Sequence, residues 1–129
     1  MNRSTLLCVD DDPGIRELYA AMLGTYEYEV LVAEGGHQAL DLFRSKVKEI
    51  DAVISDYEMP GMNGAQLAAE LKSYDPDIPV IVISGMFEAP VFLRAARSLG
   101  AITTFQKPLN LPKVMDTVKE LIGRGTQVL

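Results

Sequence analysis

The sequence predicts one α/β domain in which a parallel β-sheet is covered by helices on both faces. Three observations carry this prediction. Short apolar runs alternate five times along the 129 residues with helix-like stripes of apolar side chains. The runs are apolar at consecutive positions, which is typical of strands buried on both faces. Five such units in about 120 residues fit an open, doubly wound sheet better than an eight-unit barrel.

The first unit shows how strand and helix differ. Leu6–Val9 is a short apolar run with the length of a buried strand. After it, apolar residues recur at the spacing of one helix face, at Ile15, Leu18, Tyr19, Met22 and Leu23. Asp12 can cap this helix, Pro13 suits its first turn, and Gly24 can help to end it.

The other four units repeat the alternation. The expected strands cover 30–33, 52–54 with an end near Asp56, 80–83, and 101–105. The run at 80–83 is β-branched throughout and gives the strongest strand signal. The helical stripes run over 39–47, 67–71, 92–99 and 111–122. We expect Asn110 to cap the last helix and Gly123 to end it, so the domain covers 1–123 and a tail or linker covers 124–129.

Composition narrows the class of protein. Apolar residues make up 48% of the chain, which argues against a disordered segment. The 12 basic and 18 acidic residues give a net charge of −6, which disfavours nucleic acid or an anionic membrane as a direct partner. The single cysteine, Cys8, excludes an intramolecular disulfide. No apolar run approaches the ~20 residues of a membrane span, so we expect a cytoplasmic protein.

Charged and polar side chains gather where the expected strands end. The acidic triplet Asp10-Asp11-Asp12 follows the first strand, and Asp56 ends the third. Sites in open α/β sheets lie at these strand ends. Two carboxylates ~4 Å apart repel by about 4 kcal/mol at an effective dielectric of 20, so gathering Asp10, Asp11 and Asp56 implies a bound cation. Ligands that are all hard oxygens select Mg²⁺, with Mn²⁺ or Ca²⁺ as substitutes.

The strand ends together suit phosphoryl transfer, which depends mainly on positioning and charge neutralisation. Asp56 stands apart from the triplet and is the candidate nucleophile, which would form an aspartyl phosphate. Lys107 precedes Pro108, and the extended or cis backbone at such a position can aim its amine at Asp56. Ser84 can donate a hydrogen bond to a bound oxyanion. Taken singly, Lys107 fits a solvated surface lysine and Ser84 a turn residue.

At this point the chain resembles the receiver domain of bacterial response regulators in two-component signalling. The resemblance spans residues 6–122 and is carried by Val-Asp-Asp-Asp-Pro at 9–13, Asp-Tyr-Glu-Met-Pro-Gly-Met-Asn-Gly at 56–64, Ser-Gly at 84–85 and Lys-Pro at 107–108. It implies a flavodoxin-like fold with strand order 2-1-3-4-5. It also implies a phosphorelay signalling module that promotes its own phosphorylation and dephosphorylation, and not a turnover enzyme.

The resemblance assigns roles to the residues at the strand ends. Asp56 would accept a phosphoryl group from the phosphohistidine of a sensor histidine kinase or a phosphotransfer protein. Asp11 and Asp56 would bind Mg²⁺ directly, Asp10 mainly through water, and Glu58 through its main-chain carbonyl.

Ser84 would hydrogen-bond one phosphoryl oxygen and Lys107 would pair with another, and the Lys107–Pro108 bond is typically cis in the family. The family's conformational switch couples the hydroxyl at Ser84 to an aromatic residue three positions before the lysine. This chain has Thr104 there, which is too short to fill the pockets of an aromatic side chain. Phe105 should face the opposite side of the strand, in the core.

Two further expectations follow from the resemblance. Glu58 and Met86 occupy the positions thought to tune the lifetime of the phosphorylated state, and a large apolar Met86 would hinder an attacking water. The face formed by the fourth helix, fifth strand and fifth helix, about 88–122, would contact a downstream protein, an output domain or a second copy in a phosphorylation-dependent homodimer.

Two other interpretations stay open. The Asp10-x-Asp12 pattern after an apolar strand resembles the nucleophile motif of haloacid-dehalogenase-type phosphatases. That enzyme would need a downstream acidic pair, whereas Asp116 stands alone in a helical stripe. A receiver-like module that binds partners without phosphorylation would fit Thr104. The sequence names neither the kinase nor the output, and it does not say whether the domain belongs to a longer protein.

Overall fold

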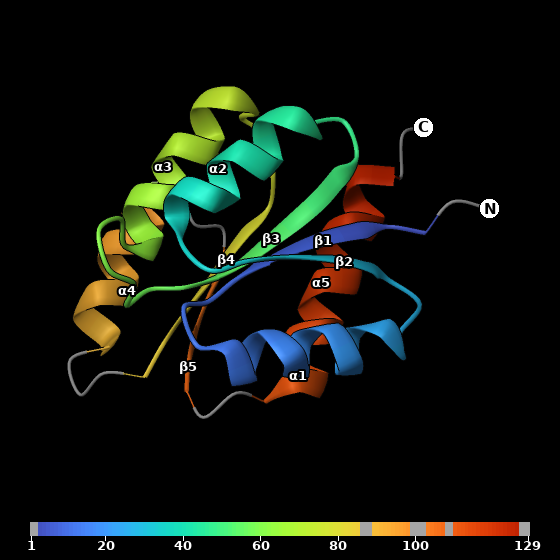
Figure 1. Ribbon diagram of the computed structural model, residues 1–129, viewed down its shortest axis with the longest axis horizontal. Coiled ribbons are helices and arrows are strands. Elements are labelled where there is room, and N and C mark those ends of the chain that lie inside the picture. Colours follow the sequence, from blue (N-terminus) through green and yellow to red (C-terminus); the bar gives the residue numbers. More distant parts are fainter. Residues whose placement is uncertain (1–2, 86–88, 99–102, 108–109, 127–129) are drawn as a thin grey trace.

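The computed structural model describes residues 3–85, 89–98, 103–107 and 110–126, which form five strands and five helices in strict alternation (Figure 1). The strands are β1 (Thr5–Val9), β2 (Glu29–Ala33), β3 (Ile50–Asp56), β4 (Val80–Ser84) and β5 (Thr103–Gln106). The helices are α1 (Pro13–Gly24), α2 (Gly36–Ser45), α3 (Gly64–Tyr74), α4 (Ala89–Ser98) and α5 (Leu111–Thr126). The five βα units predicted from the apolar pattern are therefore confirmed.

The five strands form one parallel sheet in the order β2-β1-β3-β4-β5, as the resemblance implies. The chain leaves β1 toward β2 at one edge and returns to β3 on the other side of β1. The switch point therefore lies between β1 and β3, where open α/β sheets form their binding crevice. In this pair Val9 lies opposite Ser55, so the residues that follow, Asp10 and Asp56, reach the crevice together.

Helices cover both faces of the sheet. α2, α3 and α4 lie on one face, and α1 and α5 lie on the other (Figure 1). Alternate strand residues serve the two cores: Leu7 and Val9 pack under α2 and α3, whereas Leu6 and Cys8 pack under α1 and α5. The Cys8 thiol is fully buried, and burial raises its pKa well above the ordinary range. Strands apolar on both sides thus explain the continuous apolar runs.

Side-chain caps mark the starts of α1 and α5. Asp12 caps α1, since its side chain accepts a hydrogen bond from the Gly14 N–H at 2.8 Å, and Pro13 opens the helix as predicted. Asn110 accepts from the Lys113 N–H at 3.2 Å at the start of α5. None of the helices in the described ranges is long and apolar enough to cross a bilayer.

Three details differ from the sequence prediction. Helix α2 ends at Ser45, so the last position of the predicted stripe 39–47 lies in the turn that follows. Helix α5 continues to Thr126, so its predicted end at Gly123 is wrong, because a helix tolerates glycine at a cost of about 1 kcal/mol. The domain boundary at 123 stays a prediction. Strand β5 is described from Thr103, and the earlier part of the predicted strand, 101–102, lies outside the described residues.

Candidate functional site

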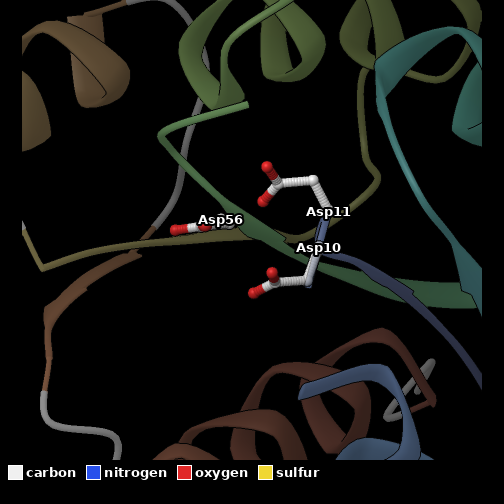
Figure 2. Close-up of side chains that lie close together, drawn as sticks. All are labelled: Asp10, Asp11 and Asp56. Carbon is white, nitrogen blue, oxygen red and sulfur yellow. The ribbon is translucent and has the colours of Figure 1, made fainter. Parts of the chain in front are cut away.

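Three carboxylates converge at the switch point. Asp10 and Asp11 follow β1, and Asp56 is the last residue of β3. One carboxylate oxygen from each lies within 4.8 Å of the others. Figure 2 shows the three side chains reaching into the same space beside the ends of the strands that carry them. The predicted gathering of these residues is therefore present.

Burial makes this cluster electrostatically unfavourable. Asp10 is 2% exposed and Asp56 is 4% exposed, while Asp11 remains exposed. Burial, with Asp10 adding its negative charge, raises the pKa of Asp56 to about 6, against an opposing effect of Lys107. Burial also raises the pKa of Asp10, although the Asp12 N–H donates to its Oδ1 at 2.9 Å and opposes the shift. The folded chain thus holds two buried acids that favour an added positive charge.

Lys107 supplies one positive charge. Its Nζ lies 3.4 Å from Asp56 Oδ1, an ion pair whose geometry does not make a hydrogen bond. Its own N–H donates to the Ser84 carbonyl at 2.8 Å, which fixes the end of β5 beside β4. Gly85 gives the lysine stem its path, because a Cβ there would lie 2.9 Å from Lys107 Cδ. Pro108 lies outside the described residues, and so does the peptide bond expected to be cis.

The donor set fits a hard divalent cation. Asp56 Oδ1 is fully buried and accepts no hydrogen bond from the described part of the chain. The clustered groups are all carboxylates, with no His or Cys among them in the described residues. Carboxylate oxygens are the ligands that Mg²⁺ takes in proteins. The side chains of Asp10, Asp11 and Asp56 are therefore able to hold Mg²⁺.

The Glu58 side chain makes contacts that the sequence analysis missed. Ser84 is completely buried, and its hydroxyl donates to Glu58 Oε2. The Gly85 N–H donates to Glu58 Oε1 at 3.2 Å. From the sequence, Glu58 was expected to bind Mg²⁺ through its main-chain carbonyl and to tune the phosphoryl lifetime, but no partner for its side chain was predicted. The sequence held one signal for this contact. A carboxylate, Glu58, follows two residues after Asp56, and the next strand ends in the hydroxyl of Ser84.

A second missed residue is Arg16, whose Nη1 donates to the main-chain carbonyl of Asp10 at 2.8 Å. This arginine lies in α1, one helical turn after the acidic triplet, and its hydrogen bond holds the loop that carries Asp10 and Asp11. The sequence shows an arginine shortly after the acidic triplet, but it does not show that the arginine donates to a main-chain carbonyl. Arg16 therefore supports the position of Asp10 through the backbone.

Thr104 lies beside α4. With Gln106 and with Pro90, Arg94 and Arg97 of α4, it lines an open groove of about 390 Å³. Phe105 packs against the core under α1 and α5, on the other face of the sheet, as strand alternation predicts. Met86 lies outside the described residues.

This fold and these strand-end residues define a response regulator receiver domain. Residues 6–119 match the family model for that domain, so the chain belongs to the response regulator receiver family. Its fold is flavodoxin-like, and its class is that of the signalling modules of two-component systems.

Among particular proteins, the chain is 32% identical over 122 residues to sporulation initiation phosphotransferase F of Bacillus subtilis (strain 168), covering 95% of this chain and 96% of that one. It is 33% identical over 118 residues to the transcriptional regulatory protein ZraR of Klebsiella oxytoca, covering 92% of this chain and 26% of that regulator. It is 35% identical over 124 residues to the sensor kinase CckA of Brucella abortus (strain 2308), covering 94% of this chain and 13% of the kinase.

Solved structures agree. A receiver domain protein from Clostridium thermocellum superposes with a TM-score of 0.89 at 25% identity, covering 98% of this chain and 99% of that one. The response regulator TrrA of Thermotoga maritima, solved in complex with Mg²⁺ and BeF, superposes with a TM-score of 0.77 at 32% identity. The match covers 92% of this chain and 98% of that one. The likeness therefore extends over almost the whole chain.

Proposed function

We propose that Asp56 is the phosphoacceptor of a two-component phosphorelay. It takes a phosphoryl group from the phosphohistidine of a sensor histidine kinase or a phosphotransfer protein, and the domain then changes conformation to regulate a partner or an attached output domain. One observation carries the proposal: the buried Oδ1 of Asp56 lies at the switch point, 3.4 Å from Lys107 and beside two further carboxylates.

The chemistry requires an ionised Asp56. A carboxylate oxygen forms a bond to phosphorus while the bond from phosphorus to the histidine nitrogen breaks, and a neutral imidazole leaves with the proton of its other nitrogen. With a pKa of about 6, Asp56 is mostly ionised at pH 7 and above. Lys107 offsets charge on one transferred oxygen, and the Ser84 hydroxyl donates to another.

We assign Mg²⁺ to the same pocket, held by the side chains of Asp11 and Asp56, by Asp10 mainly through water, and by the main-chain carbonyl of Glu58. When bound, the ion neutralises the carboxylates and the phosphoryl oxygens. The all-carboxylate donor set supports this assignment, as does the complex of the TrrA relative with Mg²⁺ and BeF. Mn²⁺ or Ca²⁺ can substitute as other hard cations.

The phosphatase interpretation needs a second acid beside Asp10, and Asp12 does not serve as one. Asp12 would have to face the reacting phosphate, but its side chain accepts the Gly14 N–H and caps α1. Asp116 is an exposed residue of α5. The strand-end geometry therefore supports a stored phosphoryl group and not turnover of phosphate esters.

The remaining assignments concern partners. We place the domain in the cytoplasm, with the α4-β5-α5 face as the contact for a downstream protein, an output domain or a second phosphorylated copy. Ser84 and Thr104 hold the two switch positions, and Thr104 borders the groove against α4. Because residue 104 is a threonine, the family's coupled movement of a hydroxyl and an aromatic side chain is not available to carry the signal to this face.

The test is incubation with Mg²⁺ and acetyl phosphate. Intact mass spectrometry should show one phosphoryl group, which is absent in Asp56→Asn and present in the exposed control Asp116→Asn. Steady release of phosphate from many esters would instead support a phosphatase. If Mg²⁺ with beryllofluoride leaves partner binding and hydrodynamic behaviour unchanged, the domain acts without phosphorylation.

A further inference from the structure

The Glu58 carboxylate crosses from the end of β3 to the end of β4. The chain beyond Asp56 is still tied to β4, because the Tyr57 N–H donates to the Ile83 carbonyl at 2.8 Å. That bond brings residue 58 beside residues 84 and 85. The carboxylate accepts one hydrogen bond from the buried Ser84 hydroxyl and another from the Gly85 N–H.

Ser84 is the residue assigned above to donate to a phosphoryl oxygen on Asp56, and the Gly85 N–H is the next donor along the same strand end. A hydroxyl and a main-chain N–H each carry a single proton, so neither can fully serve two acceptors at once. Hydrogen bonds to an ionised acceptor are also the strong ones. Glu58 lies close enough to Asp56 that, besides burial and Asp10, its charge raises the pKa of Asp56. The Glu58 carboxylate and a phosphoryl group on Asp56 therefore compete for the same place.

We propose that Glu58 is an internal anion that occupies the phosphoryl-oxygen donors in the resting state. We call the Glu58 carboxylate with its two donors, Ser84 and Gly85, the Glu58 latch. Phosphorylation of Asp56 requires the latch to open, and loss of the phosphoryl group lets it close again. Glu58 thus sets how readily this receiver leaves its resting state. This inference rests on the proposed function and deepens it, by assigning Glu58 a competing contact with Ser84 and Gly85 at the same site.

The first test measures the affinity for beryllofluoride at a fixed Mg²⁺ concentration by calorimetry. Glu58→Ala removes the competing carboxylate and should tighten binding about tenfold, or about 1.4 kcal/mol. Glu58→Gln keeps a weaker acceptor and should give a smaller gain. Glu34→Gln removes the same charge from an exposed residue just after β2 and should stay within twofold of wild type. Glu58 variants that also stay within twofold would overturn the proposal.

The second test separates the contact from a diffuse effect of charge. In a Ser84→Ala background the latch has lost one donor, so Glu58→Ala should give a gain of about threefold or less. If the full tenfold gain persists there, Glu58 acts only through its charge and the latch is refuted. In the metal-free protein, Glu58→Ala should also shift the amide resonance of Gly85, and an unchanged resonance would contradict the hydrogen bond.

The design distinguishes this inference from the proposed function. Wild-type binding of beryllofluoride that is lost in Asp56→Asn, together with unchanged affinity in Glu58→Ala, refutes the latch alone. An absence of beryllofluoride binding in the wild type and in every variant refutes the proposed function, and the latch with it.

Discussion

Replacing Asp56 by Asn should stabilise the metal-free domain, although it destroys the proposed phosphoacceptor. Folding raises the pKa of Asp56 from 3.8 to about 6. The folded state therefore binds this proton more tightly than the unfolded state does, and stability falls as pH rises through this interval. The shift is about two units at ~1.36 kcal/mol each, so the full effect is up to about 3 kcal/mol. We expect a gain of about 1–3 kcal/mol above pH 7, and none below pH 4.

The assay is urea unfolding in chelator at a series of pH values between 3.5 and 8. The two curves should coincide at the acid end and separate between pH 4 and 7, with Asp56→Asn the more stable protein. Asp10 is present in both proteins, so it leaves some pH dependence in each. Asp116→Asn, at an exposed position of α5, controls for general charge and should follow the wild type. A difference that does not vary with pH, or a less stable Asp56→Asn at pH 7.5, would refute the reasoning.

Three further predictions concern metal, lifetime and backbone. Mg²⁺ at ten times its dissociation constant should stabilise the wild type by ~1.4 kcal/mol, measured by thermal melting. The stabilisation of Asp11→Asn should be much smaller. Coincident melting curves in chelator and in millimolar Mg²⁺ would argue against the site. If Met86 hinders water, Met86→Ala should lose its phosphoryl group faster in a chase experiment, and slower loss would count against that role. Glu27 has a φ of 66°, so Glu27→Gly should be neutral or up to ~1 kcal/mol more stable in urea, whereas Glu27→Ala keeps the strain; a large loss in the glycine variant would show that the side chain matters.

Local chemistry explains why much of the fold could be predicted. Asp12 and Pro13 act on the N–H groups next to them, so the start of α1 was readable from neighbouring residues. The five βα units followed from apolar periodicity alone. Strand order did not, because periodicity does not say which strands are neighbours, and it came from the family resemblance. The end of α5 was missed because glycine permits a helix to stop without requiring it.

Part of the candidate site could also be predicted from the sequence, and part could not. Asp10 and Asp56 could be expected together because parallel strands bring their carboxyl ends to one edge. The Glu58 contact was only hinted at by a carboxylate two residues after Asp56, since its partner Ser84 lies 26 positions away and the side-chain direction is set by the loop after β3. Arg16 was missed for a similar reason: its acceptor is a main-chain carbonyl, which leaves no mark in the sequence.

The rate at which a thiol reagent modifies the buried Cys8 can measure how often the domain opens. A thiol reagent attacks the thiolate, and the folded sheet both shields this sulfur and suppresses its ionisation. Modification should therefore proceed only through molecules in which β1 has separated from α1 and α5. The labelling rate would then report the open population without denaturant. Mass spectrometry of this single site can follow how Mg²⁺ or beryllofluoride holds the sheet closed, in a chain with no tryptophan to supply a fluorescence signal.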